Sequence, residues 1–265
     1  MAYVTANDVQ LHYDTHGQGA PLLLISGLGY GGWVWQKQTP AFASHFQAIT
    51  FDNRGVGQSD KPDVPYTVPL LAADALGVLD ALNVEKAHVL GASLGGMVAL
   101  QLALDHPARV DRLILCATTF GGPNVVLPKP EVLQFMAQRS GTAEERFERG
   151  MALAFSKRFL ASRAHEADFI RQEMVKNRQP DAAYLRQAYA PLGFNVEHRL
   201  SQIPHPSLVI AGDQDQAIPA ENAKRLANKL PHATLALLEG AGHMCFIEQA
   251  KGFNETVLDF LKGTS

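Results

Sequence analysis

A serine between glycines stands where a short apolar stretch meets a helical pattern. Residues 87–91 are mostly apolar, which predicts a buried strand, and residues 94–104 carry apolar side chains at helical spacing. Between them, Gly91-Ala-Ser-Leu-Gly95 fits the G-x-S-x-G pattern of a nucleophile elbow. So sharp a turn strains the central residue, and side chains at the flanking positions would clash with the strand and helix. We expect Ser93 to be a nucleophile; the alternative is a serine that only caps the following helix.

A serine hydroxyl needs a general base at neutral pH. Of the ten histidines, His243 is the best placed, because Gly240-Ala-Gly-His-Met follows directly on the last predicted strand, at 233–238. A loop at that strand end can bring an imidazole over the elbow, and the glycines allow the backbone angles that this requires. We therefore expect His243 to take the proton from Ser93.

The acid that orients this histidine falls between serine and histidine in the chain order of elbow hydrolases. The loop after the predicted strand at 206–211 offers two carboxylates, Asp213 and Asp215. We assign the role to Asp215, which lies further from the strand and is better placed to reach an imidazole. Asp213 would then cap the loop through its own backbone. The strand at 110–117 is followed by Thr-Thr-Phe, without a carboxylate, which excludes an acid there.

An ester carbonyl under attack develops a negative charge that needs hydrogen-bond donors. One expected donor is the backbone N–H of Leu94, next to the nucleophile. The other should come from the loop after the first parallel strand, Ser26-Gly-Leu-Gly29, where Leu28 is the natural choice.

Strand and helix patterns alternate through most of the chain, which predicts parallel βαβ units and a doubly wound α/β sheet. From residue 121 to about 195 the pattern changes to amphipathic helices, expected at 131–139, 143–159, 165–177 and 181–189. We expect residues 1–120 and 196–265 to form the core. Residues 121–195 are expected to form a helical lid over the carboxyl ends of the strands, where open α/β sheets bind ligands. A single amphipathic helix is predicted to close the chain at 247–261.

Composition limits the classes of partner. The chain has 265 residues, enough for one large α/β domain with an insertion, and its formal net charge is −3. Without a basic footprint, nucleic acids and anionic membranes are poor partners. Neither a signal peptide nor a membrane-spanning run is visible, so we expect a cytoplasmic protein. The two cysteines have no zinc spacing, and we expect neither metal nor cofactor. The oligomeric state is left open.

The expected substrate pocket draws on residues near the oxyanion loop, the elbow helix and the helical stretch. Most of those in the helical stretch are expected to pack between helices. The candidates are Ser26, Tyr30, Trp33, Met97, Phe135, Met151 and Phe155.

Four motifs together resemble the α/β-hydrolase superfamily, in the right order and over nearly the whole chain. They are Gly91-Ala-Ser-Leu-Gly-Gly96, Asp52-Asn-Arg-Gly-Val-Gly-Gln-Ser59, Gly212-Asp-Gln-Asp215 and Gly240-Ala-Gly-His243. Within it, the chain is most similar to small lidded carboxylesterases and the 3-oxoadipate enol-lactonase branch. The resemblance implies an eight-stranded, mostly parallel sheet and a Ser93–Asp215–His243 triad. It also implies hydrolysis of a small carboxylic ester or lactone through an acyl-enzyme. One departure is Ser26, where many members have histidine, although some enol-lactonase-like members also carry serine.

Parts of the sequence also fit other functions. Residues 27–32 match G-x-G-x-x-G after a strand, and Asp52 ends the next strand, as in a dinucleotide-binding oxidoreductase. Trp33, Trp35 and Pro40 fit poorly with the helix such a site needs, and the elbow would stay unexplained. A ligand-binding receptor of the same fold with slow turnover is a second alternative. Among enzymes of this fold, carbon–carbon bond hydrolases and cofactor-free perhydrolases are further alternatives, and no residue of the sequence distinguishes them from an esterase.

Overall fold

The strands form one sheet in the order β1-β2-β4-β3-β5-β6-β7-β8. The computed structural model describes residues 2–137 and 140–263. β1 pairs antiparallel with β2, and β2 with β4, whereas all the other pairs are parallel. The predicted eight-stranded, mostly parallel sheet is confirmed. The strands are β1 (Ala2–Ala6), β2 (Val9–His16), β3 (Pro21–Ile25), β4 (Gln47–Phe51), β5 (Ala87–Ala92), β6 (Val110–Cys116), β7 (Ser207–Gly212) and β8 (Ala233–Leu238).

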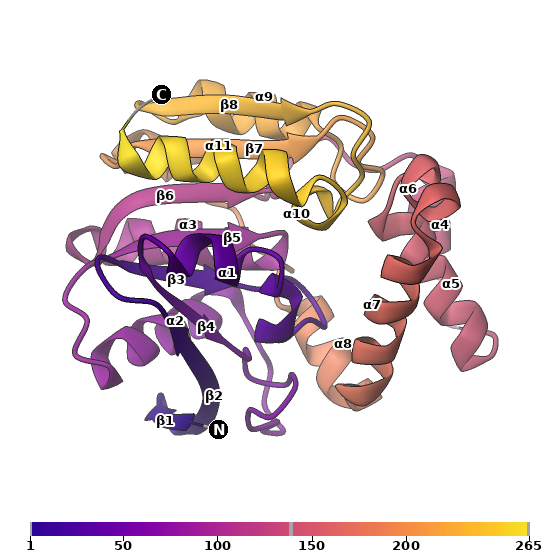
Figure 1. The fold of residues 1–265 in the computed structure, drawn as a ribbon, viewed down its shortest axis with the longest axis horizontal. Coiled ribbons are helices and arrows are strands. Elements are labelled where there is room, and N and C mark those ends of the chain that lie inside the picture. Colours follow the sequence, from indigo (N-terminus) through magenta and orange to yellow (C-terminus); the bar gives the residue numbers. More distant parts are fainter. Residues whose placement is uncertain (1, 138–139, 264–265) are drawn as a thin grey trace.

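Helices cover both faces of the sheet (Figure 1). Buried side chains of α2 (Val68–Ala81), α3 (Leu94–Asp105) and α9 (Glu221–Lys229) form one apolar cluster with the sheet. Those of α1 (Thr39–Ala43), α10 (Cys245–Glu248) and α11 (Ala250–Lys262) form a second. Short 3₁₀ helices lie at η1 (Gly32–Trp35), η2 (Pro107–Arg109) and η3 (Glu197–Gln202).

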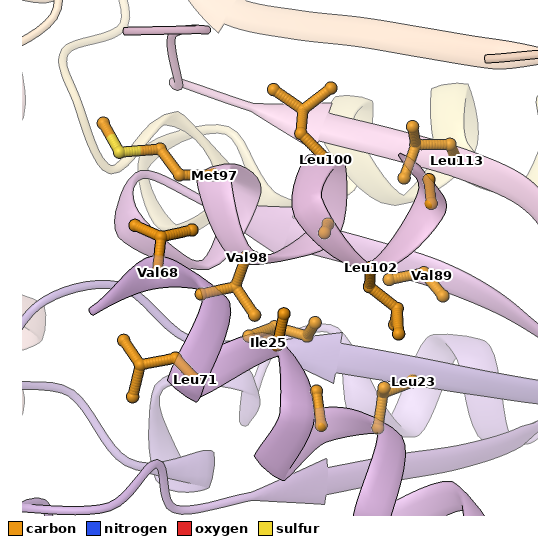
Figure 2. Packing of buried hydrophobic residues seen from close by; sticks show 14 of the residues in the cluster. Leu23, Ile25, Val68, Leu71, Val89, Met97, Val98, Leu100, Leu102 and Leu113 are labelled. Carbon is orange, nitrogen blue, oxygen red and sulfur yellow. The ribbon is translucent and has the colours of Figure 1, made fainter. Parts of the chain in front are cut away.

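Successive side chains along a buried strand point to opposite faces of the sheet and so belong to the two clusters in turn. In β3, Leu23 and Ile25 belong to the first cluster, and Leu22 and Leu24 to the second. Figure 2 shows Leu23 and Ile25 from the sheet among side chains of α2 and α3. A strand that buries both faces has no polar alternation, which explains its continuous apolar run.

In the described residues, five α-helices and the 3₁₀ helix η3 follow β6 before the chain returns to the sheet at β7. The α-helices are α4 (Pro130–Ala137), α5 (Ala143–Ala154), α6 (Lys157–Ser162), α7 (Ala164–Lys176) and α8 (Asp181–Tyr189). Figure 1 shows this α4–α8 segment beyond the end of the sheet toward which the parallel strands point. Its two ends meet, because Gly121 and Asn195 form an antiparallel bridge. The chain thus leaves and re-enters the core at one place.

Two predicted helices are each broken in two. The single helix expected over 143–159 is wrong: Ser156 accepts a hydrogen bond from Phe159 N–H and starts α6 as a new helix. The closing helix expected over 247–261 is also wrong, because Gln249 has a non-helical backbone between α10 and α11. Both breaks lie at one place in the fold, since Glu248 bonds Ser156. In residues 2–137 and 140–263, no helix has the length and hydropathy needed to cross a membrane.

Candidate active site

Ser93 sits at a strained turn between β5 and α3. Its φ is 55° and its ψ is −119°, a conformation that is uncommon for residues other than glycine. A Cβ on Gly91 would lie 2.1 Å from the Gly95 carbonyl oxygen, and one on Gly95 would lie 2.1 Å from that of Ile25. Both glycines are therefore required. The Ser93 side chain makes no capping hydrogen bond to α3, so the capping alternative does not account for the hydroxyl.

Asp215 and His243 are joined by a short hydrogen bond. His243 Nδ1 lies 2.7 Å from Asp215 Oδ2, and the Asp215 side chain is fully buried. The other carboxylate oxygen, Oδ1, accepts hydrogen bonds of 2.8 Å from the N–H groups of Ala217 and Ile218. Three donors thus fix this carboxylate, so it can hold the imidazole in one orientation and one tautomer.

Asp213 makes a different contact. It is exposed, and its Oδ1 accepts a hydrogen bond of 2.7 Å from the Gly240 N–H. This geometry agrees with the expectation that Asp213 has a structural role in its loop. The expected self-capping differs, since the bonded N–H belongs to the loop that carries His243.

Two opposing effects act on the pKa of His243. Burial lowers this pKa, but the charge of Asp215 and its hydrogen bond together outweigh burial and raise the pKa above 6.5. A raised pKa means that the imidazolium is stabilised where it stands. A base with this property accepts a proton readily and is suited to proton transfer near neutral pH.

The loop after β3 lies against Ser93. A Cβ on Gly27 would lie 3.2 Å from Ser93 Cβ and 3.8 Å from Ser93 Oγ. Among the hydrogen bonds of the described residues, none is donated by the Leu28 amide. Leu94 is the first residue of α3, where backbone N–H groups have no partner within the helix. Both expected oxyanion donors thus lie in segments that flank Ser93.

Ser26 is fully buried and holds this loop together. Its hydroxyl donates to the Gly31 carbonyl at 3.1 Å, and its own carbonyl accepts from Asn53 Nδ2 at 3.1 Å. Its hydroxyl is therefore engaged within the protein.

The remaining pocket candidates fall into two groups. The half-buried rings of Tyr30 and Trp33, which follow β3, have centroids 5.7 Å apart. Met97 is buried one turn after Ser93, in the cluster of α2 and α3 (Figure 2). The structure buries Met151 and Phe155 in the second cluster, and Phe135 is half-buried on α4.

The glycine-rich loop does not form a dinucleotide site. Gly32 begins η1, a 3₁₀ helix of four residues, instead of the longer helix whose N-terminus would bind a pyrophosphate. The Asp52 carboxylate accepts hydrogen bonds from the N–H groups of Gly32 at 2.7 Å and Gln58 at 2.9 Å. It braces two loops and is not free for a ribose. In the described residues, no group of three or more His, Cys, Asp or Glu side chains gathers as a metal site.

Two contacts that sequence patterns did not indicate connect the α4–α8 segment to the site loops. Gln187 on α8 accepts a hydrogen bond of 2.7 Å from the Gly29 N–H in the loop after β3. Glu248 accepts bonds from the Gly242 N–H at 2.9 Å and from the Ser156 N–H and hydroxyl at 2.7 and 2.6 Å. A lone glutamine or glutamate on an amphipathic helix carries no motif, so no sequence signal marked them.

A sequence model of the family described as α/β hydrolase fold matches residues 20–250. The chain belongs to the α/β-hydrolase family. It is 32% identical over 263 residues to the putative carbamate hydrolase RutD of Caulobacter vibrioides, with 96% of each chain covered.

Solved structures of hydrolases are similar over the full length. The enol-lactonase of Burkholderia xenovorans LB400 is 28% identical with a TM-score of 0.88, covering 98% of this chain and 100% of its own. The meta-cleavage product hydrolase CumD of Pseudomonas fluorescens IP01 is 25% identical with a TM-score of 0.86, covering 100% and 98%. The resemblance to the α/β-hydrolase superfamily and to enol-lactonases noted from the motifs is thereby confirmed.

Proposed function

We propose that this α/β hydrolase cleaves a small carboxylic ester or lactone, with Ser93 as nucleophile, His243 as base and Asp215 as the orienting acid. The observation that carries the proposal is the 2.7 Å bond between a fully buried carboxylate and an imidazole. A strained serine at the end of β5 adds support. Strained backbone of this kind is concentrated at active sites.

The reaction begins when Ser93 Oγ attacks the substrate carbonyl carbon and its proton passes to His243. Because Nδ1 is bonded to Asp215, the proton is taken by Nε2. The tetrahedral intermediate collapses, and the imidazolium returns the proton to the leaving oxygen. An ester releases an alcohol at this step, whereas a lactone keeps its hydroxyl tethered to the acyl group. Water, activated by the same His243, then attacks the acyl-enzyme and releases Ser93.

The amide N–H groups of Leu28 and Leu94 are proposed to bind the oxyanion of both tetrahedral intermediates. Each donor of this kind is worth about 2.7–4 kcal/mol of transition-state stabilisation. The support is the closeness of Gly27 to Ser93, where a Cβ on Gly27 would lie 3.2 Å from Ser93 Cβ, and the position of Leu94 at the start of α3.

Residues 121–195 are proposed to be a lid on a core formed by residues 1–120 and 196–265. The bridge between Gly121 and Asn195 supports these boundaries, since it brings the two ends of the segment together. Its position beyond the pointed ends of the strands (Figure 1) is where ligands bind in open α/β sheets.

Carbamates are a second candidate substrate class. The observation in favour is the 32% identity, over 96% of both chains, to a protein named putative carbamate hydrolase. A carbamate carbonyl would be attacked by Ser93 in the same way, giving a carbamoyl-enzyme in place of an acyl-enzyme.

Hydrolysis of a series of p-nitrophenyl esters, from acetate to long acyl chains, tests the proposal, with Ser93→Ala as the control. We expect turnover with a chain-length optimum that is lost in Ser93→Ala. A p-nitrophenyl carbamate in the same assay distinguishes the second class. Hydrolysis that persists at the wild-type rate in Ser93→Ala would overturn the assignment of the nucleophile.

A further inference from the structure

A buried hydroxyl is bonded to the carbonyl of the proposed nucleophile. Thr118 follows β6 and is 1% exposed, and its Oγ1 donates a hydrogen bond of 2.7 Å to the Ser93 carbonyl oxygen. The same oxygen accepts from the N–H groups of Gly96 at 2.9 Å and Met97 at 3.3 Å, in the first turn of α3. The start of a helix accounts for these two backbone bonds, but not for the bond from the threonine.

The backbone before Thr118 is strained in the same way as the elbow. Ala92 and Cys116 are partners at the ends of β5 and β6, and each is followed by a non-glycine residue with positive φ, Ser93 at 55° and Ala117 at 45°. Such conformations cost about 1–3 kcal/mol each and persist only where surrounding contacts hold them. One such contact joins the two turns, since the Ser93 N–H donates to the Cys116 carbonyl at 2.9 Å. The ends of the two strands therefore form one structural unit.

A glycine makes room for the Thr118 side chain on α3. A Cβ on Gly96 would lie 2.5 Å from Thr118 Cβ and 2.6 Å from both its Oγ1 and its Cγ2. Thr118 thus packs directly on the first turn of α3, where a β-branched side chain has little rotational freedom. This packing holds the hydroxyl in the position from which it reaches the Ser93 carbonyl oxygen.

The bonded carbonyl belongs to the peptide unit that also carries the Leu94 N–H, one of the proposed oxyanion donors. A peptide unit is planar and trans, so fixing its oxygen also fixes the direction of the N–H on its opposite side. A hydrogen bond to the carbonyl polarises the unit and strengthens the N–H as a donor. An oxyanion hole stabilises a transition state because its donors are oriented before the charge develops. The Thr118 bond supplies both the orientation and the polarisation.

We propose that Thr118 is a positioning residue, which orients and polarises the Ser93–Leu94 peptide so that the Leu94 N–H binds the oxyanion. This role rests on the proposed function, because the oxyanion forms when Ser93 attacks the substrate. The end of β6 has no carboxylate to offer the triad. Its contribution to the site is instead a hydroxyl that acts through the backbone of the elbow.

Isosteric substitution separates the hydroxyl of Thr118 from the packing of its side chain. Thr118→Val keeps the branched shape against Gly96 and removes the donor, whereas Thr118→Ser keeps the donor. Thr119→Val is the matched control, since Thr119 Oγ1 is buried and has no hydrogen-bond partner within the described part of the chain. Each variant is assayed with p-nitrophenyl acetate and with O-p-nitrophenyl thionoacetate. In the thionoester, sulfur replaces the carbonyl oxygen and accepts hydrogen bonds more weakly.

In Thr118→Val we expect kcat for the oxygen ester to fall about tenfold with an unchanged KM, since only the transition state loses stabilisation. The fall should be smaller for the thionoester, and both Thr118→Ser and Thr119→Val should stay close to the wild type. An unchanged kcat in Thr118→Val, an equal loss for both esters, or an equal loss in Thr119→Val would overturn the positioning role. Each of these results leaves the proposed function intact if Ser93→Ala abolishes turnover. Wild-type turnover in Ser93→Ala would overturn the proposed function, and the role of Thr118 with it.

Discussion

The hydrogen bond between Asp215 and His243 gives the sharpest test of the proposed mechanism, through the substitution Asp215→Asn. The native Oδ1 accepts from two backbone N–H groups, of Ala217 and Ile218, and the native Oδ2 faces His243 Nδ1. An asparagine must keep its carbonyl oxygen toward the two backbone donors, because its NH₂ group would clash with them. Its NH₂ group then faces Nδ1, which becomes an acceptor.

This substitution forces the wrong tautomer on the base. With Nδ1 accepting, the ring proton moves to Nε2, and Nε2 can no longer take the proton from Ser93. In triads of this kind, such an exchange typically lowers kcat about 10⁴-fold. That factor corresponds to about 5.4 kcal/mol of lost transition-state stabilisation. The side chain keeps its size and its two backbone bonds, so the fold should be unaffected.

The assay is the kcat for the best p-nitrophenyl ester, measured in Asp215→Asn beside the matched control Asp213→Asn. The Asp213 carboxylate accepts one bond from Gly240 N–H, and an asparagine oxygen can accept it equally well. We expect the control to stay close to the wild type. The reasoning would be refuted if Asp213→Asn lost as much activity as Asp215→Asn, or if Asp215→Asn kept more than a tenth of the wild-type kcat.

Three further perturbations follow from the same contacts. His243 must be neutral to accept a proton, so kcat/KM should fall as the pH decreases through the His243 pKa, which Asp215 raises above its ordinary value. In Asp215→Asn only the effect of burial on this pKa remains, so the fall of kcat/KM with acid should move to lower pH. Gly95→Ala places a Cβ 2.1 Å from the Ile25 carbonyl oxygen, so the free energy of unfolding measured in urea should fall by about 3 kcal/mol. An unchanged free energy of unfolding would contradict this close packing. Glu248→Ala leaves three donors without their carboxylate, so calorimetry should show a lower melting temperature and the ester assay a lower kcat. A lower melting temperature with an unchanged kcat would limit Glu248 to a structural role.

Local patterns were sufficient to predict the elements around the elbow. The strand at β5 and the helix at α3 were predicted from hydrophobic spacing, and the glycines on either side of Ser93 from the sharpness of the turn. These features depend on residues close in sequence, which is why a single chain reveals them. The strand β8 was predicted at its observed bounds, Ala233–Leu238, for the same reason.

Features that depend on distant residues were missed. The break at Ser156 is stabilised by a carboxylate 92 positions away, in Glu248. Ser156 is also a local helix cap, but a serine within an amphipathic pattern does not by itself distinguish a new helix from a continuous one. Asp215 was preferred to Asp213 from its place in the loop, but its burial and its bond to His243 depend on distant residues. Gln187 was missed because a glutamine on an amphipathic helix has no distinguishing context until the fold places it against Gly29.

The hydrogen bonds that join the α4–α8 segment to the site loops limit how this protein can be recombined with its relatives. A chimaera that exchanges residues 121–195 would have to supply an acceptor for the Gly29 N–H and a donor for Glu248. A graft without them would reposition the very loops on which the proposed oxyanion hole and base depend. The unit that can be transplanted intact is therefore larger than the helical segment. It includes residues 26–29 and 240–248 of the core, which carry the other halves of these hydrogen bonds.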